Sequence, residues 1–207
     1  MLIAPFKALG LAARDIWDDK ASVLLVNMVG VMACLTVIFA PPVIFGLAYT
    51  ANRLAAGESL GLTALIQGGR KYFVTSWLWA VLNLVIFYIV SINISFYGSA
   101  PASWGSVMQY VFVFLAVVWL MVQFYALPFF MAMEEKKPFL ALRNGWFMLM
   151  ASPVYTFVML LLLGVIILFS GMTLFPILLI TPCLIACLGA RAVQERLATL
   201  GARQPAP

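Results

Sequence analysis

Charged and apolar positions separate into long blocks along this chain. Every Asp, Glu, Lys and Arg lies outside three apolar stretches, which are Ala21–Asn52, Tyr72–Met133 and Asn144–Ala190. An apolar run of about 18 residues is already long enough to be a candidate for crossing a bilayer. The pattern therefore predicts an all-α fold, a polytopic bundle of transmembrane helices.

Four membrane spans are predicted within the second and third stretches: Tyr72–Ile92, Val107–Phe130, Trp146–Ser170 and Thr173–Leu188. A segment rich in Gly, Ser and Pro, Ser95–Ser106, separates the first pair, and a turn near Ser170-Gly171 separates the second. At 1.5 Å per residue, about 20 residues cover the ~30 Å hydrocarbon core. The last span is short and contains Pro176 and Pro182, which predict a kink or a tilt.

The first stretch, Ala21–Asn52, has two interpretations. As one straight helix it would reach about 48 Å, well beyond the hydrocarbon core. Pro41-Pro42 interrupts it, because proline lacks the backbone N–H and clashes with the preceding turn. The sequence favours a helical hairpin, in which Ala21–Phe39 crosses outward and a shorter helix from Pro42 returns. A single kinked span is the alternative, so the chain has five to six membrane helices.

The two ends flank this transmembrane domain, residues 21–190. Residues 1–20 are predicted to form an interfacial amphipathic helix whose apolar positions recur at helical spacing: Leu2, Phe6, Leu9, Ala13 and Ile16, with Trp17 beside them. A basic amphipathic helix with an aromatic anchor tends to lie in the headgroup plane. A flanking helix packed on the bundle is the alternative. Residues 191–207 are predicted to be a cytoplasmic C-terminal tail.

Two charged connections are predicted to contain short helices. Between Ala55 and Lys71, a Gly-Glu-Ser turn precedes an apolar helix face, and Gly68-Gly69 is expected to end that elbow helix. In the connection Glu134–Gly145, Pro138 stands where a helix begins, since proline suits the first helical position.

Basic residues set the orientation. They lie in both charged connections and after the last span, whereas the segments near residues 95–106 and 170–172 contain none. Under the positive-inside rule, the charged connections and the C-terminus are cytoplasmic. With the hairpin, the N-terminus is cytoplasmic as well.

Composition narrows the function classes. Hydrophobic residues make up 65% of the chain and charged residues 9%, with a net charge of +5, so a soluble enzyme and a nucleic-acid-binding domain are excluded. There is no histidine, which removes imidazole metal ligands and Ser-His-Asp hydrolysis. No ionisable residue falls within the apolar stretches, which argues against a proton-driven transporter. We therefore expect no enzyme activity, no cofactor and no metal.

Polar residues at membrane depth are the first candidate site. Asn83 and Gln123, followed by Asn27, are the side chains best suited to line a cavity for a neutral ligand. The alternative is that they join neighbouring helices, where each interhelical hydrogen bond contributes about 0.6 kcal/mol. A pore needs these groups on one continuous cavity, whereas helix pairing needs them to face one another.

Basic residues at the cytoplasmic face are the second candidate site. They are Arg53, Arg70, Lys71, Lys136 and Lys137. Such charges attract anionic headgroups by about 1 kcal/mol each, and could equally dock a cytoplasmic partner. Topology alone also accounts for basic residues at this face.

The order of several motifs resembles a known family. Pro41-Pro42, Gly46 and Gly57-Glu58 follow the first apolar stretch, Arg70–Ser76 opens the next, and Leu142-Arg143-Asn144-Gly145 comes later. This order is similar to the YesL-like family of bacterial integral membrane proteins over most of the chain. The chain departs from the family pattern at residues 62–65, where a Phe-rich stretch is usual. The resemblance implies an accessory role beside a carbohydrate transporter and supplies no catalytic residues.

These observations favour a non-enzymatic integral protein of a bacterial inner membrane that acts as a scaffold or accessory subunit. Its expected partners are the lipid bilayer and a membrane protein or a second copy of the chain, and not nucleic acid. A small transporter or channel for a neutral solute is the alternative.

Overall fold

A computed structural model describes the chain except for residues 1–3, 59–60, 100–102, 174–179 and 200–207. Every regular element in the described part is a helix, so the predicted all-α class is confirmed. The helices are α1 (Ala4–Asp18), α2 (Lys20–Cys34), α3 (Ala40–Ala55), α4 (Leu62–Lys71), α5 (Phe73–Gly98), α6 (Ser103–Ala132), α7 (Pro138–Ala151), α8 (Pro153–Thr173) and α10 (Thr181–Thr199).

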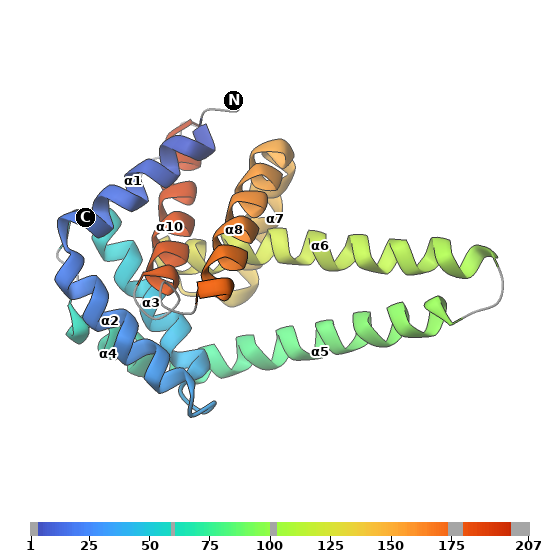
Figure 1. Cartoon of the computed structure of the whole chain (residues 1–207), viewed down its shortest axis with the longest axis horizontal. Helices are drawn as coiled ribbons and strands as arrows, with labels where there is room; N and C mark the ends of the chain where they lie inside the picture. Colours follow the sequence, from blue (N-terminus) through green and yellow to red (C-terminus); the bar gives the residue numbers. More distant parts are fainter. Residues whose placement is uncertain (1–3, 59–60, 100–102, 174–179, 200–207) are drawn as a thin grey trace.

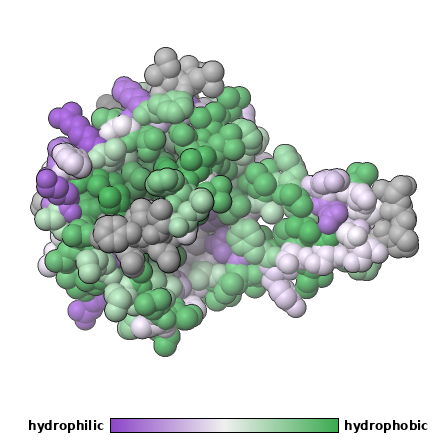
Figure 2. Space-filling view, viewed as in Figure 1, coloured by the Kyte–Doolittle hydropathy of each residue, from purple (hydrophilic) through white to green (hydrophobic). Residues whose placement is uncertain are grey.

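The molecule consists of a helical body and a long two-helix arm (Figure 1). Helices α5 and α6 lie side by side and project together away from the body, which contains the other helices. The face in Figure 2 is largely hydrophobic over the body and the adjoining part of the arm, with paler, more polar residues toward the tip. The described part therefore presents much of its apolar side-chain surface outward.

Three of the described helices are long and apolar enough to cross a membrane: Phe73–Gly98, Trp104–Ala132 and Pro153–Met172. The first two correspond to the spans predicted at Tyr72–Ile92 and Val107–Phe130; the first extends beyond its predicted end, and the second extends beyond both predicted bounds. By length and composition, the described residues thus contain three candidate membrane spans, and the predicted count of five to six is not confirmed.

The span predicted at Trp146–Ser170 is wrong at its beginning. The helix is interrupted at Ser152, whose backbone angles are φ −153° and ψ 63°. The residue before a proline is disfavoured in the helical region, and Pro153 then starts a new helix at its first position. Residues 146–151 therefore belong to α7, which begins at Pro138 as predicted.

The first apolar stretch forms two helices, as the hairpin interpretation predicts. Helices α2 and α3 pack on each other and are joined by residues 35–39, where Val37 has a φ of 56°. Pro41 and Pro42 lie in the first turn of α3 rather than in the connection, because that turn needs no N–H from them. At about 1.5 Å per residue, each helix is only ~22–24 Å long.

The final helix is displaced relative to the span predicted at Thr173–Leu188. Residues 174–179, including Pro176, lie outside the described residues, and α10 runs from Thr181 to Thr199. Pro182 is at the second position of α10, so it starts the helix and does not kink it. Residues 191–199 of the predicted tail are helical.

Helix α1 has two apolar faces. Ala8, Ala12 and Ile16 are buried against α10, whereas Phe6 and Trp17 are 56% and 72% exposed. The predicted set of apolar positions mixed residues of both faces. The N-terminal helix is thus packed on the body and keeps an exposed aromatic face, and its position in the headgroup plane stays a prediction.

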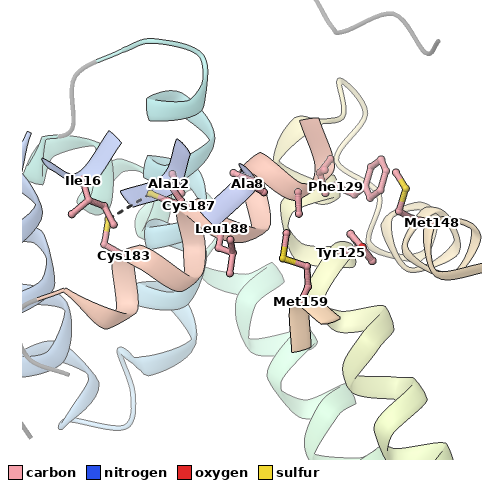
Figure 3. Packing of buried hydrophobic residues seen from close by; sticks show 14 of the residues in the cluster. Ala8, Ala12, Ile16, Tyr125, Phe129, Met148, Met159, Cys183, Cys187 and Leu188 are labelled. Atoms are coloured by element: carbon pink, nitrogen blue, oxygen red, sulfur yellow. Dashed lines mark hydrogen bonds between the residues drawn. The ribbon is translucent and has the colours of Figure 1, made fainter. Parts of the chain in front are cut away.

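The main buried cluster joins helices from both ends of the chain (Figure 3). Side chains of α1 meet Cys183, Cys187 and Leu188 of α10, and Tyr125 of α6 and Met159 of α8 continue the cluster. A second cluster lies at the base of the arm, where aromatic rings of α3, α5 and α6 contact one another. Its rings are Phe45, Tyr72, Trp79 and Phe130, with centroids 5.4–6.4 Å apart.

Glycines allow α4 to lie against the backbone of α3. A Cβ on Gly46 would stand 2.5 Å from the carbonyl oxygen of Leu65, and one on Gly68 would stand 2.7 Å from Cβ of Tyr49. Gly68 and Gly69 were predicted to end the elbow helix, but they lie inside α4, which continues to Lys71. Their role is close packing rather than termination.

The substitution Gly46→Ala is expected to lower the free energy of unfolding by about 1–3 kcal/mol, because the added methyl group meets a backbone carbonyl that cannot rotate away. Gly10→Ala is the matched control. It lies in helix α1 with open space around it, and alanine there should be neutral or stabilise by up to ~1 kcal/mol. Denaturant unfolding of both variants in detergent micelles measures the difference, and equal stabilities would contradict the packing account.

Candidate functional site

Asn83 and Gln123 lie between the two helices of the arm. The indole N–H of Trp79 on α5 donates to the Gln123 side-chain oxygen on α6 at 2.9 Å, and the indole N–H of Trp119 on α6 donates to the Asn83 oxygen on α5 at 3.0 Å. The Asn83 amide nitrogen in turn donates to the carbonyl of Trp79 at 2.8 Å. Two crossed tryptophan–amide hydrogen bonds therefore join α5 to α6.

Asn27 has a different place, in the body. Its side-chain oxygen accepts the backbone N–H of Cys183 at 2.9 Å, and its side chain is fully buried. Cys183 is in the first turn of α10, where helix N–H groups have no helical acceptor. Asn27 therefore satisfies one of these donors from another helix. The three candidate residues do not share one cavity; each joins two helices.

A cavity of about 300 Å³ lies beside Gln123, between α3, α6 and α10. Pro128, inside α6, and Pro182 and Gly189 of α10 contribute to its wall. A Cβ on Gly189 would stand 2.9 Å from Cγ of Pro128, so α10 lies close against α6 there. The Gln123 amide nitrogen is buried without a hydrogen-bond partner among the described residues. The cavity is otherwise lined by apolar side chains and could hold a small, mostly apolar ligand.

The five basic candidates are only partly available for docking. Arg53 pairs with Glu58, and Lys137 pairs with Glu135 at 2.6 Å. Lys136 donates to the carbonyls of Met131 and Met133 at the end of α6, where helix carbonyls lack helical donors. Burial, and to a smaller extent the charge of Lys71, lower the pKa of Lys136.

Arg70 and Lys71 are the most available of the basic candidates. Both are exposed, and no described carboxylate lies within ion-pair distance of either side chain. They end α4, immediately before α5 enters the arm. The Lys71 ammonium also lies 5.4 Å from the ring centre of Tyr72. The base of the arm thus carries two accessible positive charges.

The far end of the arm carries aromatic residues. Tyr97 contacts the rings of Phe96, Trp104 and Phe112, with ring centroids 5.2, 5.8 and 5.6 Å away. Aromatic rings of this kind are enriched where a membrane meets water. Positive charge at the base and an aromatic cluster at the tip bracket the apolar length of the arm.

The ion pair between Asp15 and Arg191 was missed from sequence. Nε and Nη2 of Arg191 donate to the two carboxylate oxygens of Asp15 at 2.7 and 2.8 Å, and the Asp15 and Arg191 side chains are only 16% and 21% exposed. Arg191 also donates to the carbonyl of Ala55 at the end of α3. In the sequence, these two residues are only an acid in the first helix and a base in the last. No fixed spacing between them indicates that they are in contact.

A second polar group around α8 was missed as well. The hydroxyl groups of Tyr125 and Thr156 lie 3.0 Å apart, and the Tyr155 hydroxyl donates to Glu195 at 3.2 Å. The Arg196 guanidinium stacks on the Tyr155 ring at 3.6 Å from its centre. Thr156 was recognised as a polar residue at membrane depth, but its partners depend on how α6, α8 and α10 pack.

No group of three or more His, Cys, Asp or Glu side chains able to hold a metal occurs among the described residues. Comparison with known proteins gives no match to this chain, whether with a family model, a curated protein or a solved structure. The functional argument therefore rests on the chain's own contacts.

The crossed tryptophan–amide contacts give a direct stability test. In a double-mutant cycle, Asn83→Leu and Trp119→Phe should show a coupling of about 0.6 kcal/mol, and at most ~1.7, because the two side chains share one interhelical hydrogen bond. Asn83→Leu combined with Trp146→Phe on α7 is the control pair and should be additive. Unfolding free energies in detergent micelles measure both cycles, and zero coupling in the first would rule out the bond.

Proposed function

We propose that this chain is a non-enzymatic integral protein of a bacterial inner membrane, a scaffold or accessory subunit of a membrane assembly. The observation that supports the proposal is the use of its intramembrane polar groups. Asn83, Gln123 and Asn27 are each engaged with another helix by hydrogen bonds, as expected of residues that join helices. A link to carbohydrate uptake is part of the proposal and rests on the resemblance to the YesL-like family.

The exposed arm supports a role in assembly. In the most apolar 18-residue segment of α5, only 11% is buried within the chain. In the corresponding segment of α6, 22% is buried. Surfaces of this kind must be covered by lipid or by another membrane protein. An accessory subunit that presents two apolar helices to its neighbours fits this surface.

The proposed topology has five to six membrane helices with both termini in the cytoplasm. In this topology the base of the arm, with Arg70 and Lys71, faces the cytoplasm, as the positive-inside rule favours, and the aromatic tip around Tyr97 lies at the outer surface. Helices α2 and α3 would form a hairpin in the membrane. Because each is shorter than the hydrocarbon core, local thinning of the bilayer would accompany it.

Purification at native expression in a gentle detergent tests the assembly role. We expect a second membrane protein at a fixed ratio to the tagged chain, identified and quantified by mass spectrometry. If the accessible charges at the arm base dock that partner, Arg70→Glu with Lys71→Glu should release it, while Arg14→Glu, an exposed change on α1, should not. A pure homomer without a companion would contradict the accessory-subunit proposal.

The alternative function is a small transporter or channel for a neutral solute. The specific observation in its favour is the 300 Å³ cavity, into whose wall Gln123 brings an amide with an unused nitrogen. Asn83 is not part of that wall, so a transport role rests on Gln123 alone.

Solute flux into liposomes separates the two functions. Under the transport proposal, the purified chain carries a small, mostly apolar neutral solute, and Gln123→Leu lowers the flux at least tenfold because it removes the polar group of the cavity. Asn83→Leu is the matched control, since it removes an equivalent amide that lies outside the cavity wall and should leave flux near wild type. Absence of flux from the correctly folded wild-type chain would exclude transport.

A further inference from the structure

We propose that an apolar groove beside Arg70 binds an anionic phospholipid, with an acyl chain in the groove and the phosphate group against the arginine. The groove has a volume of about 230 Å³ and lies where α2, α3 and α4 pack together at the base of the arm (Figure 1). This volume is more than ten times the ~15 Å³ that holds one water, so the groove accepts a chain of several carbon atoms. Its wall includes Ala33 of α2, Pro42 and Val43 of α3, Leu65 of α4 and Phe73 of α5.

The groove is open to its surroundings. Four of the apolar side chains that line it are 39–51% exposed, which are Val29, Phe39, Ile66 and Phe73. An apolar surface around an opening of this kind is typical of a binding groove or of a membrane contact. An acyl chain can therefore enter from the surrounding hydrocarbon without any helix having to separate from the body.

Arg70 gives the groove a charged edge. The surface of the groove is formed by apolar atoms throughout, so Arg70 contributes only the methylene groups of its side chain to the wall. The residue is exposed, which places its guanidinium group beside the groove and not inside it. No described carboxylate lies within ion-pair distance of this charge. An apolar slot with a cation at its edge has the shape and charge that suit an anionic amphiphile.

Neighbouring lysines increase the attraction for an anion. Lys71 follows Arg70 in the last turn of α4 and is exposed as well. Its charge acts on Lys136, whose pKa is lowered by burial and, to a smaller extent, by Lys71. Like charges this close to one another repel, and a negatively charged group placed among them relieves that repulsion.

The charge, and not the acyl chain, determines which lipid binds. Lipid tails are as apolar as the wall of the groove, so burial of a chain there gives little preference over the bilayer. Arginine binds the oxygens of a phosphate group with two parallel hydrogen bonds. Phosphatidylcholine carries the same phosphate together with a quaternary ammonium, which cancels the net charge and is repelled by Lys71. A lipid with a net negative charge is therefore the favoured occupant.

This inference goes beyond the accessory-subunit role and uses the proposed function only in taking the chain to be an integral membrane protein. Lipid binding is measured on the purified chain without a partner, so failure to find a partner leaves it unchanged. Release of the partner by a change at Arg70, with lipid affinity at the wild-type value, would assign the charge to the partner and contradict the lipid site. The failures of the two proposals are thus distinguishable.

Binding is tested with the purified full-length chain in a neutral detergent. Native mass spectrometry counts bound lipid as dioleoyl phosphatidylglycerol or dioleoyl phosphatidylcholine is added. We expect one phosphatidylglycerol to bind at least tenfold more tightly than phosphatidylcholine. Equal binding of the two lipids would overturn the proposal. Absence of bound lipid in both titrations would also overturn it and leave the groove to an apolar segment of a partner protein.

The charge is located by variants of Arg70. Arg70→Gln should weaken phosphatidylglycerol binding by about tenfold or more, and Arg70→Lys should weaken it less, because lysine keeps the charge but lacks the planar fork. Arg143→Gln, which removes an exposed arginine on α7, is the matched control and should leave the affinity unchanged. Wild-type affinity in Arg70→Gln would overturn the proposal.

The acyl chain is located by filling the groove. Ala33→Leu adds a larger side chain to the groove wall without a change of charge and should weaken phosphatidylglycerol binding at least fivefold. Ala21→Leu, at an exposed position of the same helix, is the matched control and should have no effect. If Ala33→Leu fails to fold, glycerophosphoglycerol, the headgroup without its chains, decides when titrated by thermal unfolding. A shift as large as that from the intact lipid, or wild-type affinity in a folded Ala33→Leu chain, would overturn the assignment of the groove to a lipid chain.

Discussion

Hydrogen bonds between helices select which helices pair at several places in this chain. Apolar contact alone cannot select a partner, because lipid tails and leucine side chains offer an apolar helix nearly the same surroundings. Trp119 with Asn83 and Trp79 with Gln123 fix the register of α5 against α6. Asn27 does the same for α2 and α10 through the amide of Cys183. The apolar clusters then fill the space that these contacts define.

The Asp15–Arg191 pair extends this selection to the chain ends. It joins α1 to α10 with both charges largely removed from water, and the further bond from Arg191 to Ala55 includes the end of α3. Removal of either partner would leave the other charge nearly buried, which typically costs 3–5 kcal/mol. Helix α10 continues through Arg191 to Thr199, because arginine is a good helix former, although a charge at this point looked like the boundary of a membrane span.

Helices α5 and α6 could be predicted because long uncharged runs leave few alternatives to a spanning helix. The division of the first stretch into two helices was favoured by its length and by Pro41-Pro42, but the connection at residues 35–39 was not located from them. The break at Ser152 was missed because hydropathy does not register backbone geometry, although the Ser-Pro sequence carried the signal. At the candidate site, Asn83 and Gln123 were identified as polar residues at membrane depth, but their tryptophan partners depend on interhelical register, which no spacing within one helix determines.

The starts of α8 and α10 are subject to the same backbone requirement. A helix that begins inside apolar surroundings leaves N–H groups that must find acceptors. At Thr181 this need is met by Asn27, a side chain of the same protein, and the result is a structural joint. At Pro153 the first residue of α8 has no N–H, so proline removes one of the donors that would need an acceptor. The same backbone requirement is therefore met by a side chain from another helix at one helix start and reduced by proline at the other.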